Sequence, residues 1–207
     1  EDSSHASAPW LSKNAILESM IFARELKEKL EANQEEKTKG MLLTATMTEV
    51  KGGTSHNVTP KDCETTFDIR IPVDMNCKTI EQKIATLVKE ISQKREVEAF
   101  YSILDETEPF EAPHNSPLVR AFTLGIMETE HSRPTLIRKT GTGDMNVLGN
   151  QWGIPVVTYG PGDPHEAHTI DEKVSVDEYL RGIEILKKTL QHLKRLHDRK
   201  MQKCSGS

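Results

Sequence analysis

The 207 residues of the chain, 35% of them hydrophobic and 29% charged, suit one large globular domain or two small ones and exclude a disordered chain. The formal net charge is −5, and lysine and arginine are dispersed among acidic residues, so the sequence lacks the basic footprint of a nucleic-acid-binding protein. The sequence has no apolar run long enough to span a bilayer. We therefore expect neither nucleic acid nor a membrane as a partner.

The cysteines and the start of the chain bear on its setting. Cys63, Cys77 and Cys204 are far apart and form neither a CxxC pair nor a disulfide framework, which predicts a reducing, cytoplasmic environment. The beginning at Glu1 has no initiator methionine and no secretory signal, so we expect the chain to be a fragment of a longer protein. Residues 204–207 have the composition of a frayed tail.

The first element in chain order is a predicted helix, with Ser12 as a possible cap and an end near residues 33–37. Its apolar residues recur at helical spacing: Ile16, Met20, Ala23, Leu26 and Leu30. Two half-buried strands are predicted next, at residues 43–48 and 63–71, because apolar and polar residues alternate there. The loop between them contains two glycines and ends at Pro60.

A second helix follows Pro72, with Thr79 and Gln82 predicted to form a capping box, and a short strand is predicted at residues 97–104. The order helix, strand, strand, helix, strand is a ferredoxin-like α+β unit that lacks only its first strand. We assign residues 1–105 to this domain.

The second domain is predicted to cover residues 106–203. A helix begins at Ser116-Pro117, two buried strands are predicted at residues 134–138 and 154–158, and each strand runs into a glycine-rich loop. The last helix is predicted to start at a capping box of Ser175 and Glu178. Strand, glycine loop and helix in repetition are typical of an α/β fold.

Residues 139–146 form the first glycine-rich loop, which offers backbone N–H groups, threonine hydroxyls and Asp144 to a ligand. A helix start capped by Asp144 explains the same residues equally well.

Residues 159–172 form the second glycine-rich loop, which holds His165 and His168 among four acidic residues. Neutral imidazole suits zinc, and a neighbouring carboxylate can orient the ring. An exposed acidic turn is the alternative, and the residue types do not choose between the two histidines. The loop supplies too few ligands to hold a metal by itself.

The other histidines carry weaker signals. His192 and His197 stand among basic residues of the last helix, where we expect solvated side chains. His5 lies between Ser4 and Ser7 in what is by itself most simply an exposed turn.

Several segments in this order resemble the second half of the two-zinc aminoacylase and carboxypeptidase family, which includes acetylornithine deacetylase and succinyl-diaminopimelate desuccinylase. The resemblance spans nearly the whole chain. It rests on His5-Ala-Ser-Ala-Pro9, Gly53-Thr-Ser-His-Asn-Val-Thr-Pro60, Phe67-Asp-Ile-Arg70, Gly141-Thr-Gly-Asp144 and His168-Thr-Ile-Asp-Glu172, with Thr59 in place of the usual isoleucine. Residues 138–146 look most like the hydrolases that release lysine or ornithine from an amino-group carrier protein.

The resemblance implies a role for each motif. His168 takes the metal-ligand position, and His5 and Asn57 belong to a lid domain that reaches the partner's active site in a homodimer. Arg70 and Thr142 hold the carboxylate or carbonyl of an N-acyl-amino acid or carrier-linked substrate. The cofactor implied is zinc, two ions per full-length subunit, with cobalt possible. The fold implied is the lid plus the C-terminal part of an α/β metallopeptidase-type catalytic domain.

The family's other metal-binding and general-base motifs, His-x-Asp and Glu-Glu, do not occur at matching places in these 207 residues, so the chain alone is expected to be inactive. Two alternatives remain from the sequence. One is a non-catalytic dimerisation or small-molecule-binding module, and the other is a dipeptidase or tripeptidase of the same family.

Overall fold

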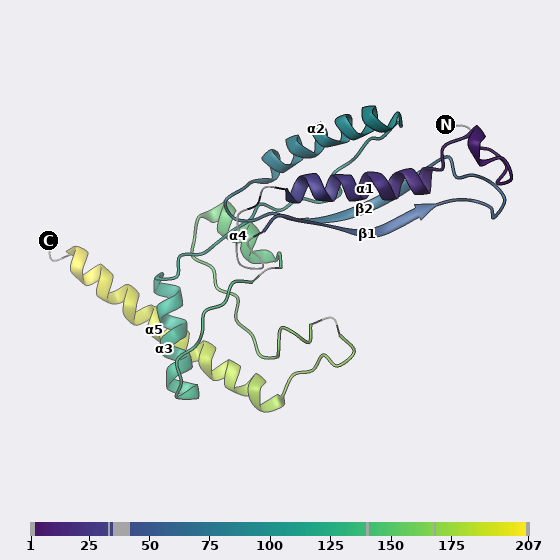
Figure 1. Cartoon of the computed structure of the whole chain (residues 1–207). Coiled ribbons are helices and arrows are strands. Elements are labelled where there is room, and N and C mark those ends of the chain that lie inside the picture. The colour runs from purple at the N-terminus through teal and green to yellow at the C-terminus, as the bar shows by residue number, and fades with distance from the viewer. Residues whose placement is uncertain (1–2, 33, 35–41, 140, 168, 206–207) are drawn as a thin grey trace. The chain divides into compact units, whose positions relative to one another are not determined.

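The computed structural model describes residues 3–32, 34, 42–139, 141–167 and 169–205 (Figure 1). The chain divides into two compact units, Glu1–Pro109 and Phe110–Ser207, each of which has its own packed helices. Within the described ranges, no helix combines the length and the apolar content needed to cross a membrane.

Unit 1 is an α+β unit. Its elements are the short helix η1 (Pro9–Leu11), α1 (Ala15–Glu31), β1 (Thr44–Gly52), β2 (Cys63–Arg70) and α2 (Cys77–Arg95). Figure 1 shows α1 running along the β1–β2 ribbon, with α2 beside it. The two helices and two strands occupy the predicted regions, and the strand pair positions the segments discussed below.

The start of α1 differs from the prediction. The side chain of Asn14, and not Ser12, caps the helix by accepting hydrogen bonds from the main-chain N–H groups of Ile16 at 3.1 Å and Leu17 at 3.2 Å. The Ser12 hydroxyl instead lies 2.7 Å from that of Ser4. Ser12 thereby ties the N-terminal segment to the start of the helix.

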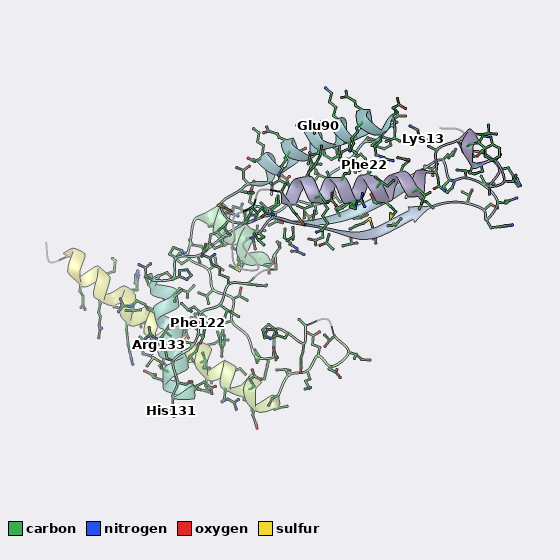
Figure 2. All side chains as sticks on the ribbon, viewed as in Figure 1. Lys13, Phe22, Glu90, Phe122, His131 and Arg133 are labelled. Atoms are coloured by element: carbon green, nitrogen blue, oxygen red, sulfur yellow. The ribbon has the colours of Figure 1, made fainter. Side chains whose placement is uncertain are left out.

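The strands pair in antiparallel register, from Thr44 opposite Arg70 to Gly52 opposite Cys63, with an irregularity between Met47 and Glu49. One face of this ribbon is covered by the helices. The core that results consists of buried residues from α1, the entry to β1, and α2: Leu26, Leu30, Leu43, Ala45, Ile80, Ile84, Leu87, Val88 and Ile91. Phe22, labelled on α1 in Figure 2, packs against this core.

The cap of α2 is also different from the prediction. Asn76 is the N-cap, and its side chain accepts a hydrogen bond of 2.8 Å from the N–H of Thr79, which was predicted to be the cap itself. An asparagine three residues earlier provides the same type of acceptor, so the helix begins at Cys77.

This correction can be tested by stability. We expect Asn76→Ala to lower the free energy of unfolding by about 1 kcal/mol, because an orphan N–H of the first turn loses its acceptor. Thr79→Ala on the same turn should change it by less than about 0.5 kcal/mol. Urea titrations followed by circular dichroism would measure both, and a larger loss for Thr79→Ala would restore the original assignment.

Three predicted strands are wrong. Residues 97–104, 134–138 and 154–158 have no strand assignment, and in the described part of the chain β1 and β2 are the only strands. A strand exists only with a hydrogen-bonded neighbour, and none of these three segments pairs with β1, with β2 or with another described segment. Several of their apolar side chains are exposed, including Ile137 at 75%.

Unit 2 contains α3 (Pro117–Glu130), α4 (Asp144–Trp152) and α5 (Val176–Ser205). The predicted cap of α3 is confirmed, since the Ser116 hydroxyl accepts from the N–H of Val119 at 3.2 Å and Pro117 is the first helical residue. Helix α3 packs closely on α5, because a Cβ added at Gly125 would lie 3.0 Å from the carbonyl oxygen of Ile185.

The face of α5 that packs on α3 carries Ile185, Thr189 and His192, all of which are buried. His192 was expected to be solvated, and that expectation is wrong, because its Nε2 atom lies 2.9 Å from the Glu128 carboxylate of α3. Tyr179, Ile183, Leu186 and Leu190 lie elsewhere on α5, and all four side chains are exposed. Unit 2 therefore presents an uncovered apolar helix face.

Candidate functional site

The His5 turn of unit 1 is joined to the loop that carries Asn57. His5 forms an isolated antiparallel bridge with Val58. The N–H of Ala6 donates to the carbonyl oxygen of Asn57, and the N–H of Thr59 donates to that of Ser4, each at 2.8 Å. Two predicted site residues that are far apart in the sequence are thus brought to one junction.

The side chains at this junction are exposed but ordered by local hydrogen bonds. The Nδ1 atom of His5 lies 2.7 Å from the Ser7 hydroxyl and accepts a hydrogen bond from the Ser7 main-chain N–H at 3.1 Å. The side-chain oxygen of Asn57 accepts from the Ser55 hydroxyl at 2.7 Å. The ring of His5 therefore has Nδ1 engaged within its own turn.

Arg70, the last residue of β2, forms a two-point ion pair with Asp68. Its Nε and Nη2 atoms each lie 2.7 Å from one oxygen of the Asp68 carboxylate. Residues two apart in a strand share a face, so the pairing follows from the strand geometry. The pair is about half exposed, with side-chain accessibility of 48% for Arg70 and 41% for Asp68. Asp68 thus fixes one edge of the guanidinium fork.

The first glycine-rich loop leads into α4. The helix begins at Asp144, with Gly143 as its N-cap, and the side-chain oxygen of Asn146 accepts from the Gly143 N–H at 3.2 Å. The cap is thus Gly143 and not Asp144, and Asp144 is an acidic residue of the first turn, where the helix dipole favours it. Thr142 precedes the cap and is exposed.

The second glycine-rich loop is held to α5 at its start, because the Glu178 carboxylate accepts from the N–H of Gly162 at 3.0 Å. Asp163 accepts from the main-chain N–H of His165 at 2.9 Å and pairs with its ring at 2.8 Å. These two contacts, the main-chain one first, lower the pKa of the Asp163 carboxyl. The ring of His165 is thus paired with Asp163. His168, the predicted metal ligand, lies outside the described residues.

A protein metal site needs several histidine, cysteine or carboxylate ligands close together. Among the described residues, no three histidine, cysteine, aspartate or glutamate side chains lie close enough to hold a metal ion. The described part of the chain does not make a metal site by itself.

The structure thus joins His5 and Asn57 within unit 1, where Arg70 also lies at the end of β2, while Thr142 belongs to unit 2. The sequence alone assigned no role to Ser7, which contacts the His5 ring, or to Asp68, which pairs with Arg70. For Asp68, the i, i+2 spacing to Arg70 in a predicted strand was a usable signal. For Ser7, the signal was a hydroxyl two residues after a histidine in a turn.

Residues 1–96 match the family described as the peptidase dimerisation domain, M20_dimer. Along the sequence, a LysW-lysine/LysW-ornithine hydrolase of Saccharolobus islandicus is 34% identical over 144 residues, which are 70% of this chain and 39% of that protein. A relative from Thermococcus kodakarensis, which carries a provisional form of the same name, is 43% identical over 99 residues, 48% of this chain and 28% of its own.

The solved structures that resemble this chain include a dipeptidase, a tripeptidase and a metallo-carboxypeptidase. The dipeptidase Dug1p of Saccharomyces cerevisiae has a TM-score of 0.75 at 12% identity, over 93% of this chain and 52% of that one. A tripeptidase of Staphylococcus aureus has a TM-score of 0.72 at 18% identity, over 94% and 49%. A metallo-carboxypeptidase of the M20 family from Sulfolobus solfataricus has a TM-score of 0.67 at 16% identity, over 93% and 55%.

These comparisons confirm the predicted fold class and the family resemblance. At such low identity the structural likeness establishes the fold alone. The chain spans about half the length of the solved structures and, in the aligned regions, 28–39% of the curated relatives.

Proposed function

We propose that the full-length protein hydrolyses a linear amide, a proposal supported by the match of residues 1–96 to the peptidase dimerisation domain of the M20 family. The substrate class is an N-acylated or carrier-linked amino acid, with lysine or ornithine as the product. The names of the relatives support this choice of substrate. The chain contributes a lid, residues 1–105, and the C-terminal part of a catalytic domain, residues 106–203.

The observation that carries the proposal is the junction of the His5 turn with the Asn57 loop. Both segments resemble family motifs, and their pairing by main-chain hydrogen bonds presents an imidazole and a carboxamide from one small region of unit 1. A histidine N–H is a suitable donor for the oxyanion that forms when water attacks an amide. We assign this role to His5, acting in the partner subunit's active site, with Asn57 as a substrate contact there.

Arg70 and Thr142 are proposed to bind the substrate's free carboxylate or carbonyl. An arginine fork suits a carboxylate because it can donate two parallel hydrogen bonds. Asp68 already contacts two of the guanidinium nitrogens, so the Arg70 fork is oriented before substrate arrives. The Arg70–Asp68 pair is about half exposed, so a ligand can approach the guanidinium.

His168 is proposed as one ligand of a divalent metal, for which zinc is the first choice and cobalt the second. The family implies two ions per full-length subunit, with the remaining ligands on residues outside this chain. When bound, such a pair lowers the pKa of a water nucleophile and polarises the scissile carbonyl. Within this chain, the proposal requires only that the loop of residues 159–172 deliver an imidazole.

The oligomer proposed is a homodimer formed through residues 1–105, which the match to a dimerisation domain supports. The cytoplasmic setting remains a prediction from cysteine usage.

A peptidase of the same family is the second candidate, favoured by the structural likeness to a dipeptidase and a tripeptidase. The test is a substrate panel. The full-length protein should release lysine or ornithine from Nα-acyl forms faster than it cleaves di- or tripeptides. The reverse order would favour the peptidase, and no turnover of either class with metal present would leave the non-catalytic module.

Arg70→Lys tests the carboxylate assignment. We expect KM for the N-acyl-amino acid to rise on the order of tenfold with kcat little changed, because lysine keeps the charge but loses the fork. Arg24→Lys, on the exposed face of α1, is the matched control and should leave both constants unchanged. Steady-state kinetics of the two variants decide the point, and an unaltered KM in Arg70→Lys would remove Arg70 from the site.

A further inference from the structure

We propose that Ser7 is a positioning residue that holds the His5 imidazole as the tautomer with its proton on Nε2. In this state Nε2–H is the one donor that the ring offers to a reacting carbonyl oxygen. The inference deepens the proposed function and rests on it for the role of His5, whereas the tautomer rests on the geometry of the turn.

The Ser7 main chain decides the tautomer. Its N–H points at Nδ1 of His5, with 3.1 Å between the two nitrogens. A main-chain N–H can only donate, so Nδ1 must present a lone pair. A neutral imidazole has one donor and one acceptor nitrogen, and the proton therefore resides on Nε2.

The Ser7 hydroxyl adds a second contact to the same atom, at 2.7 Å from Nδ1. A hydroxyl can donate or accept, and beside a nitrogen that is already an acceptor it donates. The Ser7 hydroxyl and main-chain N–H both contact Nδ1, and Ser7 is only two residues from His5. Together they limit rotation of the ring about its side-chain bonds.

The turn that carries both residues is itself anchored. The N–H of Ala8 donates to the carbonyl oxygen of His5 at 2.8 Å and closes the turn. On the preceding side, the Ser4 hydroxyl lies 3.0 Å from the hydroxyl of Thr59, which is buried. With the main-chain bonds to Asn57 and from Thr59, these contacts hold the ring at a set place relative to the Asn57 loop.

The tautomer matters because an oxyanion is stabilised only by a donor that is already oriented. With the proton on Nδ1, the ring would turn a lone pair toward the developing negative charge and repel it. The ring of His5 is exposed, and within the described part of the chain the Ser7 hydroxyl and main-chain N–H both contact its Nδ1 atom.

The tautomer can be read directly in the 207-residue chain by ¹⁵N NMR of labelled histidine at about pH 8, where an ordinary imidazole is neutral. We expect a pyrrole-type Nε2 and a pyridine-type Nδ1 for His5. Ser7→Ala should keep this spectrum, because the N–H remains.

Ser3→Ala, the same type of change two residues before His5, is the control and should leave the His5 resonances unaltered. A wild-type spectrum with the proton on Nδ1 would overturn the tautomer assignment.

The positioning role has a kinetic readout in the full-length protein. Ser7→Ala should lower kcat about fivefold at constant KM, the effect of one hydrogen bond, and Ser7→Thr should restore it. An unchanged kcat in Ser7→Ala would overturn the role of the hydroxyl. A wild-type protein inactive toward every N-acyl-amino acid would instead refute the proposed function and leave the NMR result standing.

Discussion

In the full-length protein, His168→Ala is expected to lose bound metal and to slow amide hydrolysis by more than about a hundredfold. Replacing residues that merely support a metal ligand already costs tenfold to a hundredfold, and removing the ligand itself should cost more. The loss of rate follows from the loss of the metal, because the attacking water then keeps its ordinary, high pKa. Metal analysis by mass spectrometry and a deacylation assay on the same sample would measure both effects.

His165→Ala is the matched variant, since it removes the other histidine of the same loop. Its ring is 91% exposed and pairs with Asp163, so we expect full metal content and a rate near wild type. If His165→Ala lost the metal while His168→Ala kept it, the two roles would have to be exchanged. If both variants kept metal and rate, the loop would be an acidic turn without a part in metal binding.

His5→Ala should lower kcat on the order of a hundredfold while the protein keeps its metal and its dimer, because one oxyanion donor disappears and no ligand is touched. The turn itself should survive, since its anchoring bonds run through the main chain of Ala6, Ala8 and Thr59. Stopped-flow or steady-state assays with saturating substrate would isolate kcat, and analytical ultracentrifugation would report the dimer.

The control for His5→Ala is His56→Ala, which removes an exposed imidazole from the Asn57 loop and should have little effect on kcat. A mixture of His5→Ala subunits with subunits defective in catalysis provides a sharper test of the cross-subunit arrangement. Partial recovery of activity on mixing supports a histidine donated to the partner subunit's active site. A rate for His5→Ala alone that equals wild type would remove His5 from the mechanism.

Local signals in the sequence were sufficient for the helices. Of the periodic residues of α1, Leu26 and Leu30 pack in the core as their spacing indicated, because an amphipathic stripe has one face to bury. The caps were less predictable. Asn14 and Asn76 compete with nearby hydroxyl residues for the same orphan N–H groups, and only the main-chain path decides which acceptor reaches them.

The sequence by itself also determined the motifs of the candidate site, because residue types and their spacing express the required chemistry. It could not determine pairing. Residues 134–138 and 154–158 have strand composition, yet without a neighbouring strand their hydrogen-bonding groups have no ladder to join. Helix α5 shows the same limit. Its apolar residues Tyr179, Ile183, Leu186 and Leu190 are exposed, whereas the face with Thr189 and His192 packs on α3.

Only the tertiary structure decided which neighbouring groups each site residue contacts. The bridge between His5 and Val58 depends on the β1–β2 ribbon bringing residues 57–59 back to the N-terminal turn, a contact that no local pattern encodes. In the closed turn, the main-chain N–H of Ser7 donates a hydrogen bond to Nδ1 of His5. Sequence specifies which groups can react, while the folded main chain specifies which atom of each group is left to do so.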